Sequence, residues 1–385
     1  MRDGIKKALA LVFLLACAAA YTAGPVSRGV WGQARAGDAL AKWRPGGRDN
    51  SGLRYVGSET CAGCHAKEAA TQPSTPMGRA SQLASDCDIL KARPRLSFRN
   101  GRYTYRLTRE GAGSVYTVSD GVSQVSEPVL FCFGQGSAGQ TYIFRRRGVY
   151  YESRVSYFES LGGLDITIEH PRAEAASLEE ALGRPMTAEA TRGCFGCHTT
   201  GAAGAVGLQP ERASAGVSCE ACHGPGERHV AAVKAKETKN LQIYNPAALD
   251  GLELSQEFCG SCHQSFDTVM GLHEQGGAGN VRFQPYRIFN SRGHLTEDRR
   301  MSCVACHDPH GPLERDPVRY DASCLACHLT TPGAPKTRAR NASACPVATK
   351  SCVTCHMPKV ELPSMHFKFT DHWVRIVRPG QPVPR

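Results

Sequence analysis

The stretch SCEACHGPGERH, residues 218–229, contains the pattern that decides the fold of this chain. Two cysteines stand two residues apart, and a histidine follows the second one directly. This Cys-x-x-Cys-His pattern is typical of covalent c-type haem attachment. The spacing has a mechanical reason, because the two thiols bond to the two vinyl groups on one edge of the haem. The histidine then brings its imidazole under the iron as the proximal ligand.

The same pattern occurs seven times, and we number the copies motifs 1–7 in chain order. They are Cys61/Cys64/His65, Cys194/Cys197/His198, Cys219/Cys222/His223, Cys259/Cys262/His263, Cys303/Cys306/His307, Cys324/Cys327/His328 and Cys352/Cys355/His356. Fourteen of the 18 cysteines lie in these motifs. We therefore predict seven covalently attached haem c groups and a mainly α and irregular multihaem cytochrome c fold.

Two other chemistries also use pairs of cysteines. Structural zinc sites are built from Cys-x-x-Cys pairs, but zinc does not require a histidine directly after every pair. A thioredoxin-like dithiol needs one copy of the motif in an α/β context, whereas this chain has seven. The sequence therefore favours haem over both alternatives.

The N-terminus has the form of a secretory signal. Three basic residues precede the apolar run ALALVFLLACAAA at 8–20, which is too short for an ordinary membrane span. We predict a signal peptide over 1–23, a flexible linker over 24–54, and a location in the periplasm or outer cell envelope. The run LLAC at 14–17 also resembles a lipoprotein box, so membrane attachment through Cys17 stays an alternative.

The formal net charge of +11 at first indicates an acidic partner. Each haem carries two propionates, however, so seven ferric haems with two imidazole ligands would lower the charge from +11 to about +4. No other feature supports binding to nucleic acid. We expect the partners to be redox proteins, such as other cytochromes, a dehydrogenase or a reductase.

The interval between motifs 1 and 2 differs from the rest of the chain. Apolar residues alternate with polar ones around 96–98 and 103–107, on either side of the turn signal Asn100-Gly101. Further strands are predicted at 115–118, 141–144 and 149–158, followed by a helix at 173–182. Ser255 is expected to cap the helix of motif 4.

These patterns divide the chain after the linker into four parts. They are a motif 1 segment over 55–94, an antiparallel β insert over 95–170, a six-haem domain over 171–375, and a tail over 376–385. Cys87 and Cys132 flank much of the insert and are candidates for a disulfide in an oxidising compartment. A buried free Cys132 is the alternative, and Cys345 remains unassigned.

Seven of the 14 histidines lie outside the motifs, which suggests a second imidazole for each iron. The candidate distal ligands are His170, His229, His294, His310, His366 and His372, whereas His273 is expected to be exposed. His310 follows His307 so closely that it would reach a neighbouring haem. Of the last two candidates, we favour His372. Met77 is a further candidate, since a thioether ligand would raise the potential of its haem.

Several stretches resemble one known family. They are YVGSETCAGCHAKE, GVSCEACHGPGERHV, SCVACHDPHGPL, YDASCLACH, and SCVTCHMPK with FTDHW. They are similar to the multihaem cytochromes typified by the tetrahaem electron acceptor of hydroxylamine oxidoreductase. The resemblance implies stacked haem pairs, mostly two-imidazole ligation and electron transfer, with distal ligands at His229, His294, His310 and His372. Relatives often have His-His after motif 1, where this chain has Pro76-Met77, and no tetratricopeptide repeats follow.

We therefore expect a protein that carries electrons from a donor cytochrome or dehydrogenase to a terminal reductase or outer-membrane conduit. The alternative is an oxidoreductase for a small nitrogen or sulfur compound, which needs one iron with an open position. Motif 1 is the expected place for it, because its distal histidine is not evident. The arginines at 145–147 are a candidate source of charge for an anion, or else a solvated turn. No catalytic residue is predicted.

Overall fold

The computed structural model describes residues 43–47, 51–204, 207–271, 278–291, 301–328 and 347–378, together with 345, 380, 381 and 383. These residues belong to one of the two units of the chain, Lys42–Arg385. The predicted signal peptide, the lipoprotein alternative at Cys17, and the candidates His273 and His294 lie outside the described residues. Within the described ranges, no helix is both long and apolar enough to cross a membrane.

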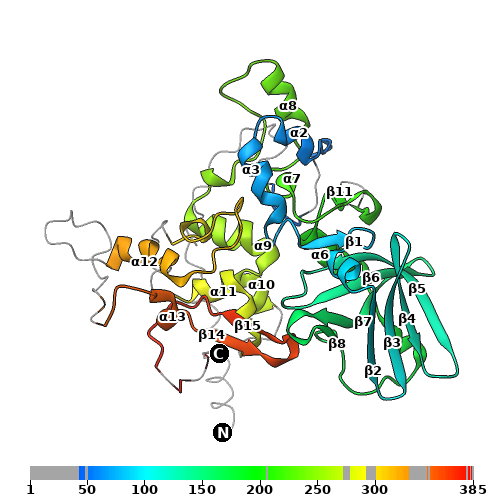
Figure 1. Cartoon of the computed structure of the whole chain (residues 1–385). Coiled ribbons are helices and arrows are strands. Elements are labelled where there is room, and N and C mark those ends of the chain that lie inside the picture. The colour runs from blue at the N-terminus through cyan, green and yellow to red at the C-terminus, as the bar shows by residue number, and fades with distance from the viewer. Residues whose placement is uncertain are drawn as a thin grey trace, which may run out of the picture. The chain divides into compact units, whose positions relative to one another are not determined.

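An antiparallel sheet of nine strands occupies most of the interval between motifs 1 and 2 (Figure 1). Seven strands are neighbours in sequence order: β2 (Arg95–Asn100), β3 (Tyr103–Glu110), β4 (Gly113–Ser119), β5 (Gln124–Phe133), β6 (Gln140–Arg146), β7 (Val149–Phe158) and β8 (Gly163–Ile166). β1 (Ser81–Leu83) pairs with β5, and β9 (Gly183–Pro185) pairs with β7. The strands predicted over 96–158 are present, and the sheet extends past both ends of the predicted insert.

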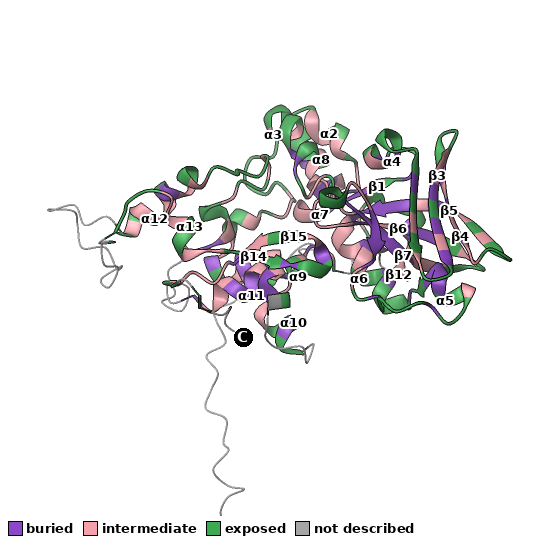
Figure 2. Ribbon diagram, turned by 60° about the horizontal axis from the view of Figure 1, so that its bottom comes forward, coloured by how far each residue is buried: buried purple, intermediate pink, exposed green. Residues whose placement is uncertain are grey.

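Buried and more exposed residues alternate along β3, so one face of this strand packs into a hydrophobic core. Tyr103, Tyr105 and Leu107 of β3 are fully buried, and the residues between them are not. They join Tyr116 and Tyr142 of neighbouring strands in one hydrophobic cluster. Figure 2 shows buried residues along the strands of this sheet. The period of two in the sequence is therefore the pattern that defines the sheet.

Two local predictions differ from the structure. The turn between β2 and β3 is Gly101-Arg102, one residue later than predicted, and Gly101 takes the left-handed φ of 59°. The helix predicted over 173–182 forms only as α5 (Leu178–Leu182). The buried guanidinium of Arg154 binds the carbonyls of Pro171 and Ala173 at 3.0 and 2.8 Å. Those carbonyls therefore have a partner other than a helical N–H group.

Short helices carry the motifs. The elements that contain motif residues are α2 (Ser58–Ala62), α6 (Ala188–His198), α7 (Cys219–His223), η5 (Glu253–Cys259), α9 (Gly260–His263), η8 (Cys303–Ala305), α12 (Asp321–His328) and α13 (Cys352–His356). Ser255 does not cap the motif 4 helix but lies buried inside η5, which is π-helical. The π-helix is rare and occurs frequently at functional sites.

The remaining elements connect the motifs. They are α3 (Ala66–Thr71), α4 (Asp88–Ala92), α8 (Glu227–Lys234), α10 (Phe266–Gly271), α11 (Gln284–Phe289), and the hairpin of β14 (Lys359–Leu362) and β15 (Phe367–Thr370), with short two-stranded pairs and 3-10 turns between them. The prediction of a mainly α fold is not supported, because the largest regular element among the described residues is the antiparallel sheet. Short helices and irregular segments predominate only in the region of the motifs.

Motif 2 is joined to the sheet by an aromatic cluster. Phe195, the second residue of the motif, is fully buried. Its ring meets Phe131 and Phe133 of β5 edge-on, at 5.1 and 5.0 Å between ring centroids. Tyr150 of β7 makes a third such contact at 5.5 Å. The sheet therefore supplies one wall of the motif 2 site.

The two cysteines proposed to pair are neighbours in the core. Cys87 and Cys132 are both fully buried free thiols. The thiol of Cys87 lies 3.1 Å from Oε1 of Gln140 and also contacts Cys132, and this second contact is the main cause that lowers the pKa of Cys87 to about 7. Their proximity agrees with the sequence expectation, and the disulfide itself stays a prediction.

Replacing Phe195 with Ala tests the aromatic cluster. We expect the free energy of unfolding to fall by about 3–5 kcal/mol, because truncating a buried aromatic ring leaves a cavity. Thermal unfolding followed by circular dichroism measures the change. Val122→Ala is the matched control, since Val122 is 96% exposed, and we expect a change below about 0.5 kcal/mol. Equal losses in both variants would contradict the role of the cluster.

Candidate haem-binding sites

Backbone carbonyls fix the proximal imidazoles of three motifs. Nδ1 of His198 lies 2.9 Å from the carbonyl oxygen of Ala80, and Nδ1 of His223 lies 3.0 Å from that of Tyr244. In motif 7, Nδ1 of His356 lies 2.9 Å from a carbonyl oxygen near the C-terminus. A carbonyl only accepts, so Nδ1 carries the proton and Nε2 is the atom left to bind a metal.

Burial favours the neutral imidazole in four of the motifs, and the neutral form is the one that binds iron. Loss of solvent lowers the pKa of His198, His223, His263 and His307 below the ordinary value. His263 is additionally close to Gln284 of α11. His65 and His328 are exposed.

Three proximal histidines face a histidine from another part of the chain. The ring centroids are 6.4 Å apart for His65 and His229, 6.0 Å for His223 and His310, and 6.2 Å for His307 and His372. A metal–imidazole bond is about 2.0–2.1 Å long and the ring nitrogen is about 1.2 Å from the ring centre, so two imidazoles on opposite sides of one iron have centroids about 6.4 Å apart. The three centroid distances agree with this value.

Two of the distal candidates have the same carbonyl contact as the proximal histidines. Nδ1 of His229 lies 2.7 Å from the carbonyl oxygen of Leu241, and Nδ1 of His372 lies 3.0 Å from that of Thr370. Burial lowers the pKa of His372 to about 4. Nε2 of both rings is thus left for a metal. His310 is half-exposed, and Thr71 of α3 donates to its backbone carbonyl at 2.7 Å.

The other candidates lie elsewhere. Nε2 of His170 is 3.1 Å from a carboxylate oxygen of Glu152, and Nε2 of His366 is 2.8 Å from one of Asp165. In both residues the nitrogen that would bind a metal already faces a carboxylate. Met77 is half-buried, and its carbonyl accepts from the backbone N–H of Ala80 and of Val217, each at 3.0 Å. Its backbone thus joins the strand β1 region to the segment before motif 3.

The motif cysteines bring the attachment sites together in space. All fourteen are free thiols, half-buried or exposed. Four contacts between motifs are thiol-to-thiol: Cys61 with Cys219, Cys197 with Cys262, Cys259 with Cys303, and Cys324 with Cys352. Cys222 is also within electrostatic reach of Cys262, and Cys306 of Cys324. Motifs far apart in the sequence, such as 1 and 3, are therefore neighbours.

Cys306 of motif 5 is exposed, like two of the three second cysteines of motifs 1, 6 and 7. These three are Cys64 and Cys355, which are exposed, and Cys327, which is half-buried. In the part of the chain that the structure describes, none of these three thiols contacts another motif, and that of Cys355 lies 3.9 Å from the Thr354 hydroxyl of its own motif. Each stands at the end of a short helix or just after one, so little of the chain covers it.

Covalent attachment through all fourteen motif cysteines, Cys64, Cys327 and Cys355 included, stays a prediction from the motif.

Buried carboxylates tie two of these neighbouring motifs to each other. Glu220, inside motif 3, accepts from the backbone N–H groups of Val56, Gly57 and Gly226, each at 2.8 Å. Two of these donors directly precede α2, which leads into motif 1. A single side chain thus fixes the relative position of motifs 1 and 3.

Asp321 makes the corresponding contact between motifs 6 and 7. It begins α12, the helix of motif 6, and is buried. Its two oxygens accept from the backbone N–H groups of Ser351 and Cys352, at 2.7 and 2.8 Å, where α13 starts. The first N–H groups of a helix lack partners within it, so an acidic side chain there stabilises the helix.

The sequence did not reveal these supporting contacts. An acidic residue inside motif 3 was visible, but two of the N–H groups that it binds are 164 and 163 residues away. The carbonyl acceptors leave no mark in the sequence, because every residue has one. Within the described residues no group of three or more His, Cys, Asp or Glu is arranged to hold a metal ion.

Comparison with known proteins supports a c-type cytochrome. Residues 167–224, which include motifs 2 and 3, match the family described as cytochrome c554 and c-prime. No curated protein matches the chain. Among solved structures, the outer cell wall cytochrome OcwA is similar with a TM-score of 0.45 and 15% identity, over 84% of this chain and 80% of that chain. The family match, with the repeated attachment motif, supports several covalently bound haem c groups and electron transfer.

Replacing Glu220 with Gln tests the contact between motifs 1 and 3. We expect the free energy of unfolding to fall by about 1.5–3 kcal/mol, because hydrogen bonds to a charged acceptor are lost from a buried site. Denaturant unfolding followed by Soret absorbance measures the change. Glu59→Gln, an exposed change in the adjacent helix α2, is the control and should change little. A Glu220 variant as stable as the control would show that the contact is dispensable.

Proposed function

We propose that this chain is a heptahaem c-type cytochrome that carries electrons in the bacterial cell envelope. The observation that carries the proposal is the spacing of three histidine pairs, 6.0–6.4 Å between ring centroids. That spacing fits one iron between the two rings of each pair. The seven attachment motifs and the family match at 167–224 support the proposal independently.

Each proposed ligand pair combines a motif histidine with a histidine that follows a later motif. The pairs are His65 with His229 for motif 1, His223 with His310 for motif 3, and His307 with His372 for motif 5. His170 and His366 are proposed to be structural, since carboxylates occupy their Nε2 atoms. With His229 opposite His65, Met77 is not needed at motif 1.

When bound, haem c supplies an iron that alternates between the ferric and ferrous states. At motifs 1, 3 and 5, the two histidines of each pair would hold the iron and leave no position for water or substrate. Hydrogen bonds from Nδ1 to backbone carbonyls hold the rings of His223, His229 and His372 in one orientation. Fixed ligands suit a carrier, which gains or loses an electron without binding a substrate.

Contacts between the motif cysteines support a route for electrons. The thiol contacts link motif 1 to 3, motif 2 to 4, motif 4 to 5, and motif 6 to 7. Weaker links join motif 3 to 4 and motif 5 to 6. We infer a continuous path from motif 1 through 3, 4, 5 and 6 to 7, with motif 2 as a branch at motif 4.

The partners that fit this path are redox proteins outside the cytoplasmic membrane. We propose a donor cytochrome or dehydrogenase at one end and a terminal reductase or outer-membrane conduit at the other. The signal-like N-terminus and the chemistry of c-type haem attachment support a periplasmic or outer-envelope location. Attachment to a membrane through Cys17 remains part of this proposal.

An oxidoreductase is the competing function, and it needs one iron with an open position. The sequence suggested motif 1 for that role, and His229 opposite His65 argues against it. The arginines at 145–147 are also weak candidates for binding an anionic substrate. Arg145 and Arg146 already have carboxylate partners, Glu211 and Glu127. We therefore favour the carrier, and a wild-type protein with one high-spin ferric haem per chain would reverse that preference.

The number of haems is a direct prediction. The mature chain should carry seven, one for each motif, because every motif contains both attachment thiols and the proximal histidine. Intact-mass spectrometry measures the mass added to the polypeptide. A chain carrying fewer than seven haems after full maturation would remove at least one motif from the proposal.

Replacing His310 with Ala tests the ligand pairs. Motif 3 should keep its covalent haem but lose its second imidazole, so one low-spin haem becomes high-spin. The ferrous variant should then bind one equivalent of carbon monoxide. Electron paramagnetic resonance and carbon monoxide difference spectra measure both effects. His366→Ala is the matched control and should leave all haems low-spin; the opposite result, with His366 changing the spin state and His310 not, would refute the assignment.

A further inference from the structure

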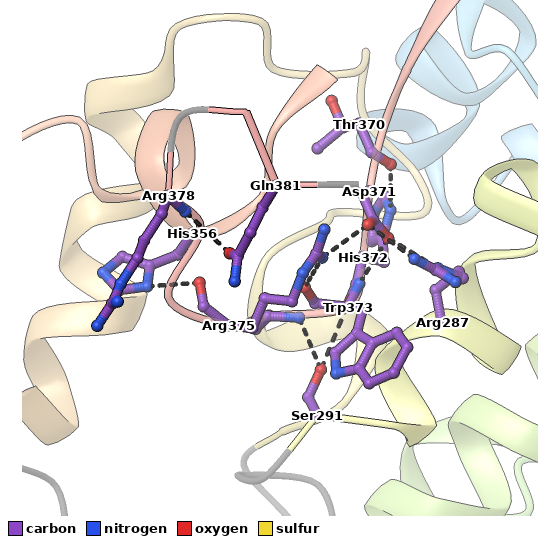
Figure 3. Close-up of polar contacts among 11 residues, drawn as sticks. Arg287, Ser291, His356, Thr370, Asp371, His372, Trp373, Arg375, Arg378 and Gln381 are labelled. Atoms are coloured by element: carbon purple, nitrogen blue, oxygen red, sulfur yellow. Dashed lines mark hydrogen bonds and ion pairs between the residues drawn. The ribbon is translucent and has the colours of Figure 1, made fainter. Parts of the chain in front are cut away.

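Asp371 lies at the centre of a buried ionic cluster (Figure 3). Its side chain is 0% exposed, as is that of Arg287 of α11. Arg287 donates to both carboxylate oxygens, from Nε and Nη2, each at 2.8 Å. Arg375 donates to Oδ2 at 2.7 Å, and the backbone N–H of Trp373 donates to Oδ1 at 3.0 Å. Every lone pair direction of this carboxylate is thus in use.

The indole of Trp373 completes the cluster. The guanidinium carbons of Arg287 and Arg375 lie 5.0 and 5.8 Å from its ring centroid. The aromatic face attracts both cations and keeps them near the single carboxylate. One anion and two cations therefore form a rigid unit that joins α11 to the chain segment 371–375.

This segment serves two motifs at once. His372, next to Asp371, faces His307 of motif 5. Four residues after Asp371, the carbonyl of Arg375 is the partner of Nδ1 of His356, the proximal histidine of motif 7, at 2.9 Å. The N–H of Arg375 returns a bond to the His356 carbonyl at 3.2 Å. The orientation of both imidazoles therefore depends on where one short segment lies.

Ser291 and the residue before the β14–β15 hairpin also bind the segment 371–375. The Ser291 hydroxyl accepts from the N–H of Val374 at 2.8 Å and donates to the carbonyl of His372 at 3.4 Å. The N–H of Asp371 donates to the carbonyl of Pro358, just before β14, at 2.9 Å. Ser291 lies just after α11, so its contacts also hold the segment near that helix. The bidentate ion pair adds two charge-assisted hydrogen bonds in a fixed geometry.

We propose that Asp371 and Arg287 are positioning residues that orient two iron ligands together, His372 for motif 5 and His356 for motif 7. The inference rests on the proposed function, because it takes His372 as the distal ligand of motif 5. It goes beyond that function in one respect: a single buried ion pair controls two haems whose motifs are 49 residues apart, counted from Cys303 to Cys352. The two haems should therefore respond to the same substitution.

The charge of the cluster sets the direction of the response. With Asp371 ionised, the cluster holds two positive charges and one negative charge. An Asp371→Asn change leaves the positive charges without a counterion. Positive charge near an iron disfavours the ferric form, so the reduction potentials of the motif 5 and motif 7 haems should both rise.

The experiment compares Asp371→Asn with wild type in the holoprotein. Spectroelectrochemical titration should show an upward shift of two of the seven reduction waves, with all seven haems retained by mass. Glu127→Gln is the matched control, because Glu127 forms a carboxylate–arginine pair with Arg146 at 2.6 Å within the sheet. The control should shift no wave. In a Cys352→Ser/Cys355→Ser background, which lacks the motif 7 haem, Asp371→Asn should shift only one wave.

A His372→Ala variant distinguishes a wrong ligand assignment at motif 5 from a wrong positioning role for Asp371. If it produces no high-spin haem, the proposed ligand of motif 5 is wrong. If it does, and Asp371→Asn shifts no wave or a single wave in the complete protein, the positioning role is overturned. Should Asp371→Asn lose haem, Arg287→Lys replaces it, since lysine keeps the charge and loses the bidentate geometry. It should perturb the same two haems, and loss of haem from both variants would also overturn the inference.

Discussion

The hydrogen bond from an imidazole Nδ1 to a distant backbone carbonyl is the interaction on which the rest of the structure depends. The motif fixes the two thiols and the histidine in sequence, but it does not fix the rotation of the ring. The carbonyls of Ala80 and Tyr244 do so for motifs 2 and 3, from 118 and 21 residues away. Local attachment chemistry therefore requires long-range folding, because a ring that rotated freely would not present Nε2 to an iron.

The same constraint explains the path of the chain. For motifs 1, 3 and 5, the imidazole opposite the proximal one comes from the segment that follows motif 3, 5 or 7. Each such segment thus closes the site that began two motifs earlier, and successive sites are interlocked. Isolated short helices are unstable and need support from the rest of the fold. Carboxylates such as Glu220 and Asp321 supply part of that support, because they bind the N–H groups at helix starts.

The sequence predicted the parts of this arrangement that repeat locally. Attachment motifs have fixed spacing, and the strands of the sheet have a period of two, so both were visible. Choosing between His366 and His372 was harder, because both lie in one aromatic stretch. The structure separates them through the left-handed backbone at His366, φ 49°, with its Nε2 at Asp165. The sequence did not predict the π-helical turn Glu253–Cys259. Nor did it predict the short helix α5, because Arg154 binds the carbonyls before that helix from a distant strand.

Buried carboxylates also link the electrostatics of neighbouring motifs. Glu220 lies between motifs 1 and 3, Asp321 between motifs 6 and 7, and Asp371 between the ligands of motifs 5 and 7. A charge shared by two sites moves both potentials in the same direction, so it does not open a gap between neighbours. A chain of carriers needs small differences between the reduction potentials of adjacent haems. A haem with a much higher potential than its neighbour would retain the electron. In the proposed carrier, the charges of Glu220, Asp321 and Asp371 would therefore not separate the potentials of the haems that they lie between.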